Sequence, residues 1–131
     1  MVIDSHTLLW WFEGGEKLSP MVREILSGIG EGEREFIVSA VTFWEFRLKE
    51  LRGQLQPKRP LREWPDVLIQ TGNVSLMDVS TEIWFLAAEL NWDHRDPADR
   101  IIAATALKYG VPVLTKDIRF HESDSPVKAV W

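Results

Sequence analysis

Residues His94–Ala106, HRDPADRIIAATA, decide the fold of this chain, because they contain a helix start and the helix that follows it. Asp96 is a residue type favoured at a helix N-cap, and Pro97 suits the first helical position. Three alanines let this helix approach its neighbours closely, and Gly110 is suited to its C-cap. Asp99 shares a helix face with apolar residues, where a carboxylate is costly unless another group pairs with it.

The composition indicates one globular domain, residues 1–131. The chain is 45% hydrophobic and 11% aromatic, which is enough to build a core. It has no cysteine, which excludes disulfides and thiolate metal sites and suits a reducing cytoplasm. No apolar run approaches the roughly 18 residues that a membrane span needs. The N-terminus lacks the basic region of a signal peptide, so we expect a cytoplasmic protein.

Short apolar segments alternate with helical segments along the whole sequence. This pattern predicts an α/β fold with a central, mostly parallel sheet of four to five short strands and helices on both faces. The predicted strands are residues 2–3, 36–38, 74–79, 111–114 and 127–130, the last at an edge. The predicted helices are residues 7–13, 20–29, 41–52, 61–71, 81–90 and 97–109.

Four carboxylates follow strands or begin helices at this sheet. Asp4 ends the first strand, Asp117 follows the fourth, Glu45 lies in the helix after the second, and Asp99 lies in the first turn of its helix. Ligands of open parallel sheets bind beyond the carboxyl ends of the strands. The sequence therefore predicts that these four side chains converge at one edge.

Two of the four have structural explanations that compete with this one. Asp4 is also suited to capping the first helix, and Glu45 to pairing with Lys49 one turn later, worth roughly 0.3–0.5 kcal/mol. On that interpretation neither carboxylate takes part in chemistry.

The other two also have structural explanations. Asp99 is placed to interact with the helix dipole or to pair with Arg95 or Arg100, and Asp117 suits a turn. Four such coincidences at strand ends are harder to accept than any one of them, which favours the shared site.

Clustered carboxylates need a counter-charge, because their mutual repulsion would otherwise raise their pKa values. One or two Mg²⁺ or Mn²⁺ ions meet this need, since both prefer oxygen ligands and retain waters that meet substrate phosphates. Such ions lower the pKa of water and stabilise the leaving oxygen in phosphodiester cleavage. The histidines His6, His94 and His121 are scattered, so no zinc site is predicted. His94 is expected to serve a loop or cap, with contact to the substrate as the alternative.

Charge is distributed unevenly, although the net charge is −5. The segment Arg47–Arg62 has six basic residues and one acid, whereas the remaining residues are strongly acidic. This basic segment is either a solvated surface or a phosphate-binding rim.

Four motifs together resemble the PIN-domain ribonucleases, and within them the VapC-like toxins of type II toxin–antitoxin systems. They are VIDSHTLLWW at residues 2–11, SAVTFWE at 39–45, HRDPADR at 94–100 and LTKD at 114–117. The resemblance covers nearly the whole chain. The bulky Phe46 and the Arg47 after it depart from the family pattern.

The resemblance implies a PIN fold, Mg²⁺ or Mn²⁺ dependence, single-stranded or structured RNA as substrate, a homodimer, and a VapB-like antitoxin whose segment occupies a groove near the site. The implied catalytic and metal-binding residues are Asp4, Glu45, Asp99 and Asp117. Asp96, Thr115 and Ser5 are expected to support them. The candidate RNA-binding residues are Arg47, Lys49, Lys58 and Arg59. Most of the tryptophans are expected to pack in the core. The candidates among them for a dimer or antitoxin surface are Trp10, Trp11, Trp44 and Trp84.

Three alternatives stay open from the sequence. The first is a phosphoacceptor signalling module, which is also a parallel α/β fold with acids at strand ends. The second is a PIN domain without catalysis that binds only RNA or protein. The third is a PIN nuclease outside toxin–antitoxin biology.

Overall fold

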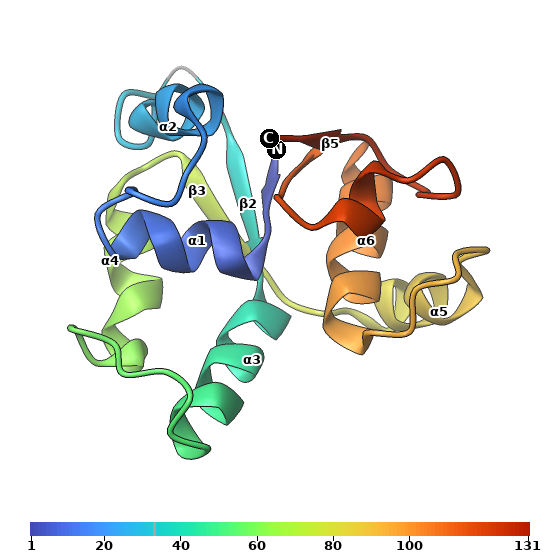
Figure 1. Cartoon of the computed structure of the whole chain (residues 1–131), viewed down its shortest axis with the longest axis horizontal. Helices are drawn as coiled ribbons and strands as arrows, with labels where there is room; N and C mark the ends of the chain where they lie inside the picture. Colours follow the sequence, from blue (N-terminus) through green and yellow to red (C-terminus); the bar gives the residue numbers. More distant parts are fainter. Residues whose placement is uncertain (33) are drawn as a thin grey trace.

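The chain folds around a five-stranded sheet in which every neighbouring pair of strands is parallel (Figure 1). The computed structural model describes residues 1–32 and 34–131. The strand order is β3-β2-β1-β4-β5. The strands are β1 (Val2–Ile3), β2 (Phe36–Ser39), β3 (Val74–Met77), β4 (Val113–Leu114) and β5 (Ala129–Val130). The parallel sheet and the edge position of the last strand are as predicted.

Six α-helices and two short 3₁₀ helices are found in the described residues. The α-helices are α1 (Ser5–Phe12), α2 (Pro20–Ser27), α3 (Ala40–Leu51), α4 (Trp64–Gln70), α5 (Thr81–Glu89) and α6 (Pro97–Tyr109). The 3₁₀ helices are η1 (Leu61–Glu63) and η2 (Ile118–His121). Among the described residues, no helix is both long and apolar enough to cross a bilayer.

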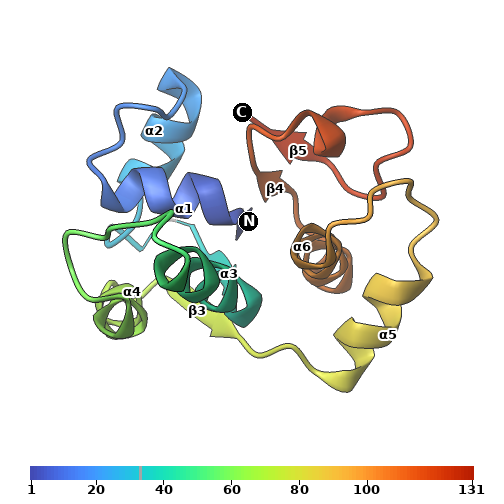
Figure 2. The same cartoon turned by 60° about the horizontal axis from the view of Figure 1, so that its bottom comes forward.

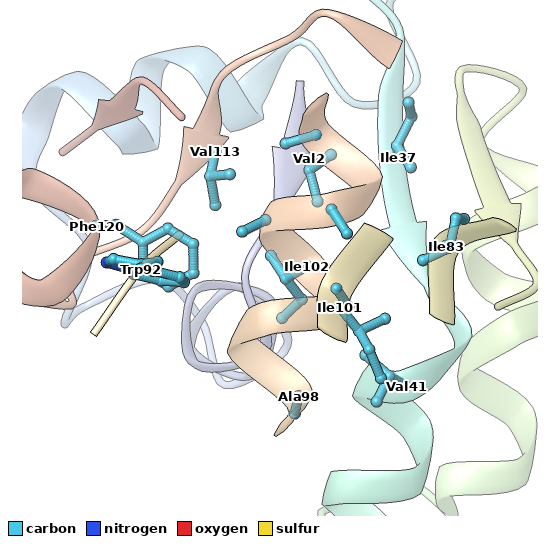
Figure 3. Close-up of a cluster of buried hydrophobic side chains, with 14 residues drawn as sticks. Val2, Ile37, Val41, Ile83, Trp92, Ala98, Ile101, Ile102, Val113 and Phe120 are labelled. Atoms are coloured by element: carbon cyan, nitrogen blue, oxygen red, sulfur yellow. The ribbon is translucent and has the colours of Figure 1, made fainter. Parts of the chain in front are cut away.

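The sheet separates two hydrophobic cores. Helices α5 and α6 lie on one side, and α1, α2 and α4 lie on the other (Figure 2). Side chains of a strand alternate between faces, so Val2 packs in the α6 core and Ile3 in the opposite one. Figure 3 shows the α6 core, with Val2 and Val113 of neighbouring strands near Ile102.

Helix α6 has the ends that its sequence predicts. The Asp96 side chain accepts hydrogen bonds from Ala98 N at 2.9 Å and from Asp99 N at 3.2 Å. Gly110 ends the helix with φ of 64°, a left-handed conformation that glycine adopts without steric cost. Local hydrogen bonds therefore fix where this helix starts and where it stops.

Several other boundaries differ from the prediction. Helix α1 begins at Ser5 rather than Thr7, because Leu8 N already donates to Asp4 O at 2.9 Å. Residues 61–71 divide into η1 and α4 near Pro65, which has no amide hydrogen to donate. Strand β4 is shorter than predicted, since residues 111–112 lie outside it.

The strand order also places the site. Strand β1 leads through α1 and α2 to β2 on one side, whereas β4 lies on its other side, so the order reverses between β1 and β4. The carboxyl ends at such a point are the usual ligand position of open α/β sheets. The flavodoxin-like order 2-1-3-4-5, which receiver domains share, is different, so the phosphoacceptor alternative does not fit this fold.

Candidate active site

Asp4 and Asp117 are linked through Thr115 at the carboxyl ends of β1 and β4. Asp4 directly follows β1, and its amide donates to Leu114 O of β4 at 3.1 Å. The Thr115 hydroxyl donates to Asp4 Oδ2 at 3.0 Å and accepts from Asp117 N at 3.0 Å. One buried hydroxyl thus holds the segments that carry both carboxylates. Asp4 does not use its side chain to cap α1, contrary to the structural alternative.

Glu45 reaches the same region from α3. The Ser5 hydroxyl, one residue after Asp4, donates to Glu45 Oε2 at 2.5 Å and lies 3.1 Å from Thr42 Oγ1. The alternative ion pair between Glu45 and Lys49 is not formed. Instead, Lys49 Nζ lies 3.4 Å from His6 Nε2.

Asp99 is joined to His94, for which the sequence predicts a role in a loop or cap. His94 Nε2 lies 2.6 Å from Asp99 Oδ2. One donor atom from each of His94, Asp99 and Asp117 lies within 4.8 Å of the other two, a spacing that fits one metal ion. His94 lies in the loop before α6, as expected, and its ring in addition contacts Asp99, which a loop or cap role does not include. The sequence signal for this contact is that His94 lies five residues before Asp99. A loop has no periodicity, however, so the sequence does not show which way the His94 side chain points.

Arg100 does not pair with Asp99, contrary to the second structural alternative. Its guanidinium donates instead to five backbone carbonyl oxygens at 2.8–3.4 Å. They belong to Ala87, Ala88, Leu90, Trp92 and His94. The guanidinium thereby ties the end of α5 and the following loop to α6. Arg95 is exposed.

The cluster concentrates negative charge away from water. Asp4 is 2% exposed, and burial raises the pKa of its carboxyl. Glu45 acts in the same direction, against the charge of His6 and the hydrogen bonds from Thr115 and the Ser5 backbone. Burial also raises the pKa of Asp99 to about 7, and the charges of Asp4 and Asp96 act in the same direction, against the hydrogen bond from His94. The charge of Glu45 thus opposes ionisation of Asp4, and the charge of Asp4 opposes ionisation of Asp99.

The donor set fits a hard divalent cation. Within residues 1–32 and 34–131, no lysine or arginine forms an ion pair with Asp4, Glu45, Asp99 or Asp117. Carboxylate oxygens are the ligands that Mg²⁺ and Mn²⁺ prefer, and imidazole is also accepted by transition metals. The missing counter-charge is what such an ion supplies.

The basic segment does not behave as a single surface. Arg47 pairs with Glu50 on α3, and Lys49 faces His6. Lys58 and Arg59 line a surface groove of about 720 Å³. The other lining residues come mainly from α1 and α4 and include Trp11, Phe12 and Trp64. None of the four clustered carboxylates lines this groove.

Comparison with known proteins agrees with this geometry. Residues 1–125 match the family model of the PIN domain. The chain is 28% identical over 134 residues to Ribonuclease VapC22 of Mycobacterium tuberculosis (strain ATCC 25618 / H37Rv), with 100% of this chain and 98% of that protein covered.

Solved structures of similar fold include two complexes. FitAcB from Neisseria gonorrhoeae has a TM-score of 0.66 at 18% identity, covering 99% of this chain and 96% of that one. DNA-bound VapBC from Salmonella typhimurium has a TM-score of 0.65 at 17% identity, covering 98% and 95%. Since the family model spans nearly the whole described fold, including all four carboxylates, this chain belongs to the PIN-domain family.

Proposed function

We propose that this chain is a metal-dependent endoribonuclease and the toxin of a VapBC-type toxin–antitoxin pair. The observation that carries the proposal is the convergence of carboxylates, none of which has a lysine or arginine partner in the described residues, at the point where the strand order reverses. The 28% identity to a protein named as a ribonuclease supports RNA as the substrate.

Asp4, Glu45, Asp99 and Asp117 would hold one or two Mg²⁺ or Mn²⁺ ions. A bound ion supplies positive charge to the scissile phosphate and lowers the pKa of water. Thr115 and Ser5 orient the carboxylates through the hydrogen bonds described above, and Asp96 fixes the first turn of α6. His94 adds a nitrogen donor, which favours Mn²⁺ over Mg²⁺.

Cleavage of a mixed RNA pool tests the proposal. The purified protein is compared with Mg²⁺, with Mn²⁺ and with EDTA, beside Asp99→Asn. Asp66→Asn, the same chemical change at an exposed position of α4, is the matched control. We expect cleavage that needs metal, survives Asp66→Asn and is lost in Asp99→Asn. Cleavage that survives EDTA or Asp99→Asn would contradict the proposed site, and intact RNA with a protein that binds Mn²⁺ would favour the non-catalytic PIN domain.

Arg47, Lys49, Lys58 and Arg59 remain the predicted RNA-binding residues of the basic segment. For a single strand, removing one cation that neutralises a phosphate lowers the dependence of affinity on salt by about 0.7 in the logarithmic slope. Neutralising Lys58 and Arg59 should therefore reduce both affinity and slope. Unchanged values for both would assign the groove another role, such as holding a partner segment.

The antitoxin partner is supported by the solved relatives, which include a toxin–antitoxin complex from Klebsiella pneumoniae with a TM-score of 0.64. We expect the product of a small adjacent upstream gene to bind this chain and to suppress its cleavage of RNA. A chain that cleaves RNA but has no such neighbour would instead be a PIN nuclease outside toxin–antitoxin systems.

A further inference from the structure

A strip of aromatic and cationic side chains begins beside Asp4 and runs along α1. Lys49 Nζ lies 3.4 Å from His6 Nε2, and the His6 ring centroid is 6.0 Å from that of Trp10. Lys116 Nζ lies 5.9 Å from the Trp10 ring centroid. The Trp131 ring lies edge-on to Trp10, with centroids 5.6 Å apart. These five residues are linked by the contacts above and are called here the α1 strip. Trp10 and Trp131 are half-buried against the core on this side of the sheet.

The α1 strip is attached to the same elements as the carboxylates. His6 and Trp10 lie one turn apart on the same face of α1, which starts directly after Asp4. Lys49 lies one turn after Glu45 on α3, and Lys116 lies between Thr115 and Asp117. The strip therefore has a fixed position relative to the acidic cluster.

The charges of the strip are free to meet a ligand. His6 and Lys116 are exposed, and in the described part of the chain neither Lys49 nor Lys116 forms an ion pair with a carboxylate. Negative charge in this region is gathered in the cluster itself, in a chain of net charge −5. A polyanion approaching that cluster needs local cations, and the α1 strip provides them.

We propose that the α1 strip binds single-stranded RNA, with unpaired bases stacked on Trp10 and His6 and phosphates held by Lys49 and Lys116. This inference rests on the proposed function. It adds the residues that would hold the strand beside the acidic cluster, since the family resemblance already implies RNA as the substrate. Aromatic rings interleaved with cations bind single strands in a sequence-tolerant way, because every base offers a π-face. Paired bases in a duplex are already stacked and do not expose that face.

The test measures binding without cleavage, using fluorescence anisotropy of a labelled unstructured RNA oligonucleotide in EDTA. Trp10→Leu should weaken binding about tenfold, within the range known for base–aromatic stacking, whereas Trp10→Phe should retain most of the affinity. Lys116→Gln should weaken binding and lower the logarithmic salt slope by about 0.7. Lys128→Gln is the matched control, because Lys128 is exposed and lies at the amino end of β5, whereas the α1 strip lies at the carboxyl ends of the strands.

Several results would overturn the proposal. They are unchanged affinity in Trp10→Leu, equal weakening in Trp10→Leu and Trp10→Phe, equal weakening in Lys116→Gln and Lys128→Gln, or a duplex of the same length that binds as well as the single strand. Circular dichroism of each variant establishes that the fold is kept. Binding is measured in EDTA and is therefore independent of cleavage. A wild-type protein that binds the oligonucleotide but cleaves no RNA with metal would contradict the proposed nuclease activity and would still support RNA binding by the α1 strip. Specific binding to an antitoxin peptide, with no RNA binding, would assign the strip to that partner.

Discussion

Ionisation of Asp99 is less favourable in the folded protein than in the unfolded chain, and a bound cation would offset this cost. The pKa of the Asp99 carboxyl is raised to about 7, first by burial and then by Asp4 and Asp96. The ionised form is thus less favourable in the folded chain than in the unfolded one. The free energy of unfolding of the metal-free protein should therefore fall as pH rises from about 4 to about 7.

Asp99→Asn should remove the part of this dependence that comes from Asp99, while the part from buried Asp4 stays. In EDTA we expect the variant to have a higher Tm than the wild type at about pH 8, and a smaller advantage at about pH 5, where Asp99 of the folded wild type is protonated. Thermal unfolding at both pH values measures the difference, and Asp66→Asn should show no such change. A variant less stable than the wild type at the higher pH would show that the contact with His94 outweighs the cost of burying the Asp99 carboxylate.

Mn²⁺ should reverse the order at the higher pH. A ligand that binds only the folded state raises Tm, and protons compete with the metal for carboxylates. The expected gain in Tm is larger for the wild type than for Asp99→Asn. Equal gains for the two proteins would place the ion elsewhere.

Helix α6 depends on Arg100 for its connection to α5. The guanidinium is the one group in the described chain that joins five carbonyls across the end of α5 and the loop to His94. A lysine amine has three donors on one atom and cannot reach all of them. This contact also positions the backbone of His94, whose ring meets Asp99.

Arg100→Lys should therefore lower the free energy of unfolding by about 1–3 kcal/mol and displace His94. Arg23→Lys is the matched control, because Arg23 also donates to carbonyl oxygens, those of Gly15, Glu16 and Leu18. Chemical denaturation measures the first effect in both variants. The imidazole NMR signals of His94 should move in Arg100→Lys alone, and unchanged signals would mean that Arg100 only stabilises α5.

The alanines of α6 set how closely this helix approaches the sheet. Ala103 and its neighbour Ala104 are fully buried in the α6 core. Ala103→Leu should cost about 1–3 kcal/mol, because a well-packed core accepts extra methyl groups only by shifting its neighbours. Ala88→Leu, at an exposed position of α5, should lower the free energy of unfolding much less. Similar urea midpoints for the two variants would show that the core has unused space.

The molecule as a whole presents an apolar groove of about 380 Å³ beside α3, α5 and α6. Trp44 and Trp84 line it and are 56% and 54% exposed. Large exposed aromatic side chains at a groove are typical of protein interfaces, which agrees with the homodimer expected from the family resemblance.

Trp84→Glu should convert the predicted dimer to a monomer, because a carboxylate in an apolar interface is costly. Light scattering coupled to size-exclusion chromatography gives the mass. Met21→Glu, at a side chain 56% exposed on α2, should leave the mass unchanged. A monomeric wild type would contradict the expectation.

The sequence determined the elements whose signals are local. The N-cap at Asp96, the proline after it and the left-handed Gly110 define α6 through contacts within a few residues. The alternation of short apolar segments with helical segments predicted a parallel sheet. The carboxylates at the strand ends predicted a candidate site at the carboxyl ends of its strands.

Only the tertiary structure decided which groups meet. The strand order brought Asp4 beside Thr115, 111 residues apart in sequence, through a hydrogen bond that no local pattern encodes. Lys49 lies beside His6 and forms no ion pair with Glu45. Arg100 donates hydrogen bonds to carbonyl oxygens and forms no ion pair with Asp99. Charge partners in a folded chain are set by the packing of helices on the sheet, so long cationic side chains find acceptors that spacing along one helix does not predict.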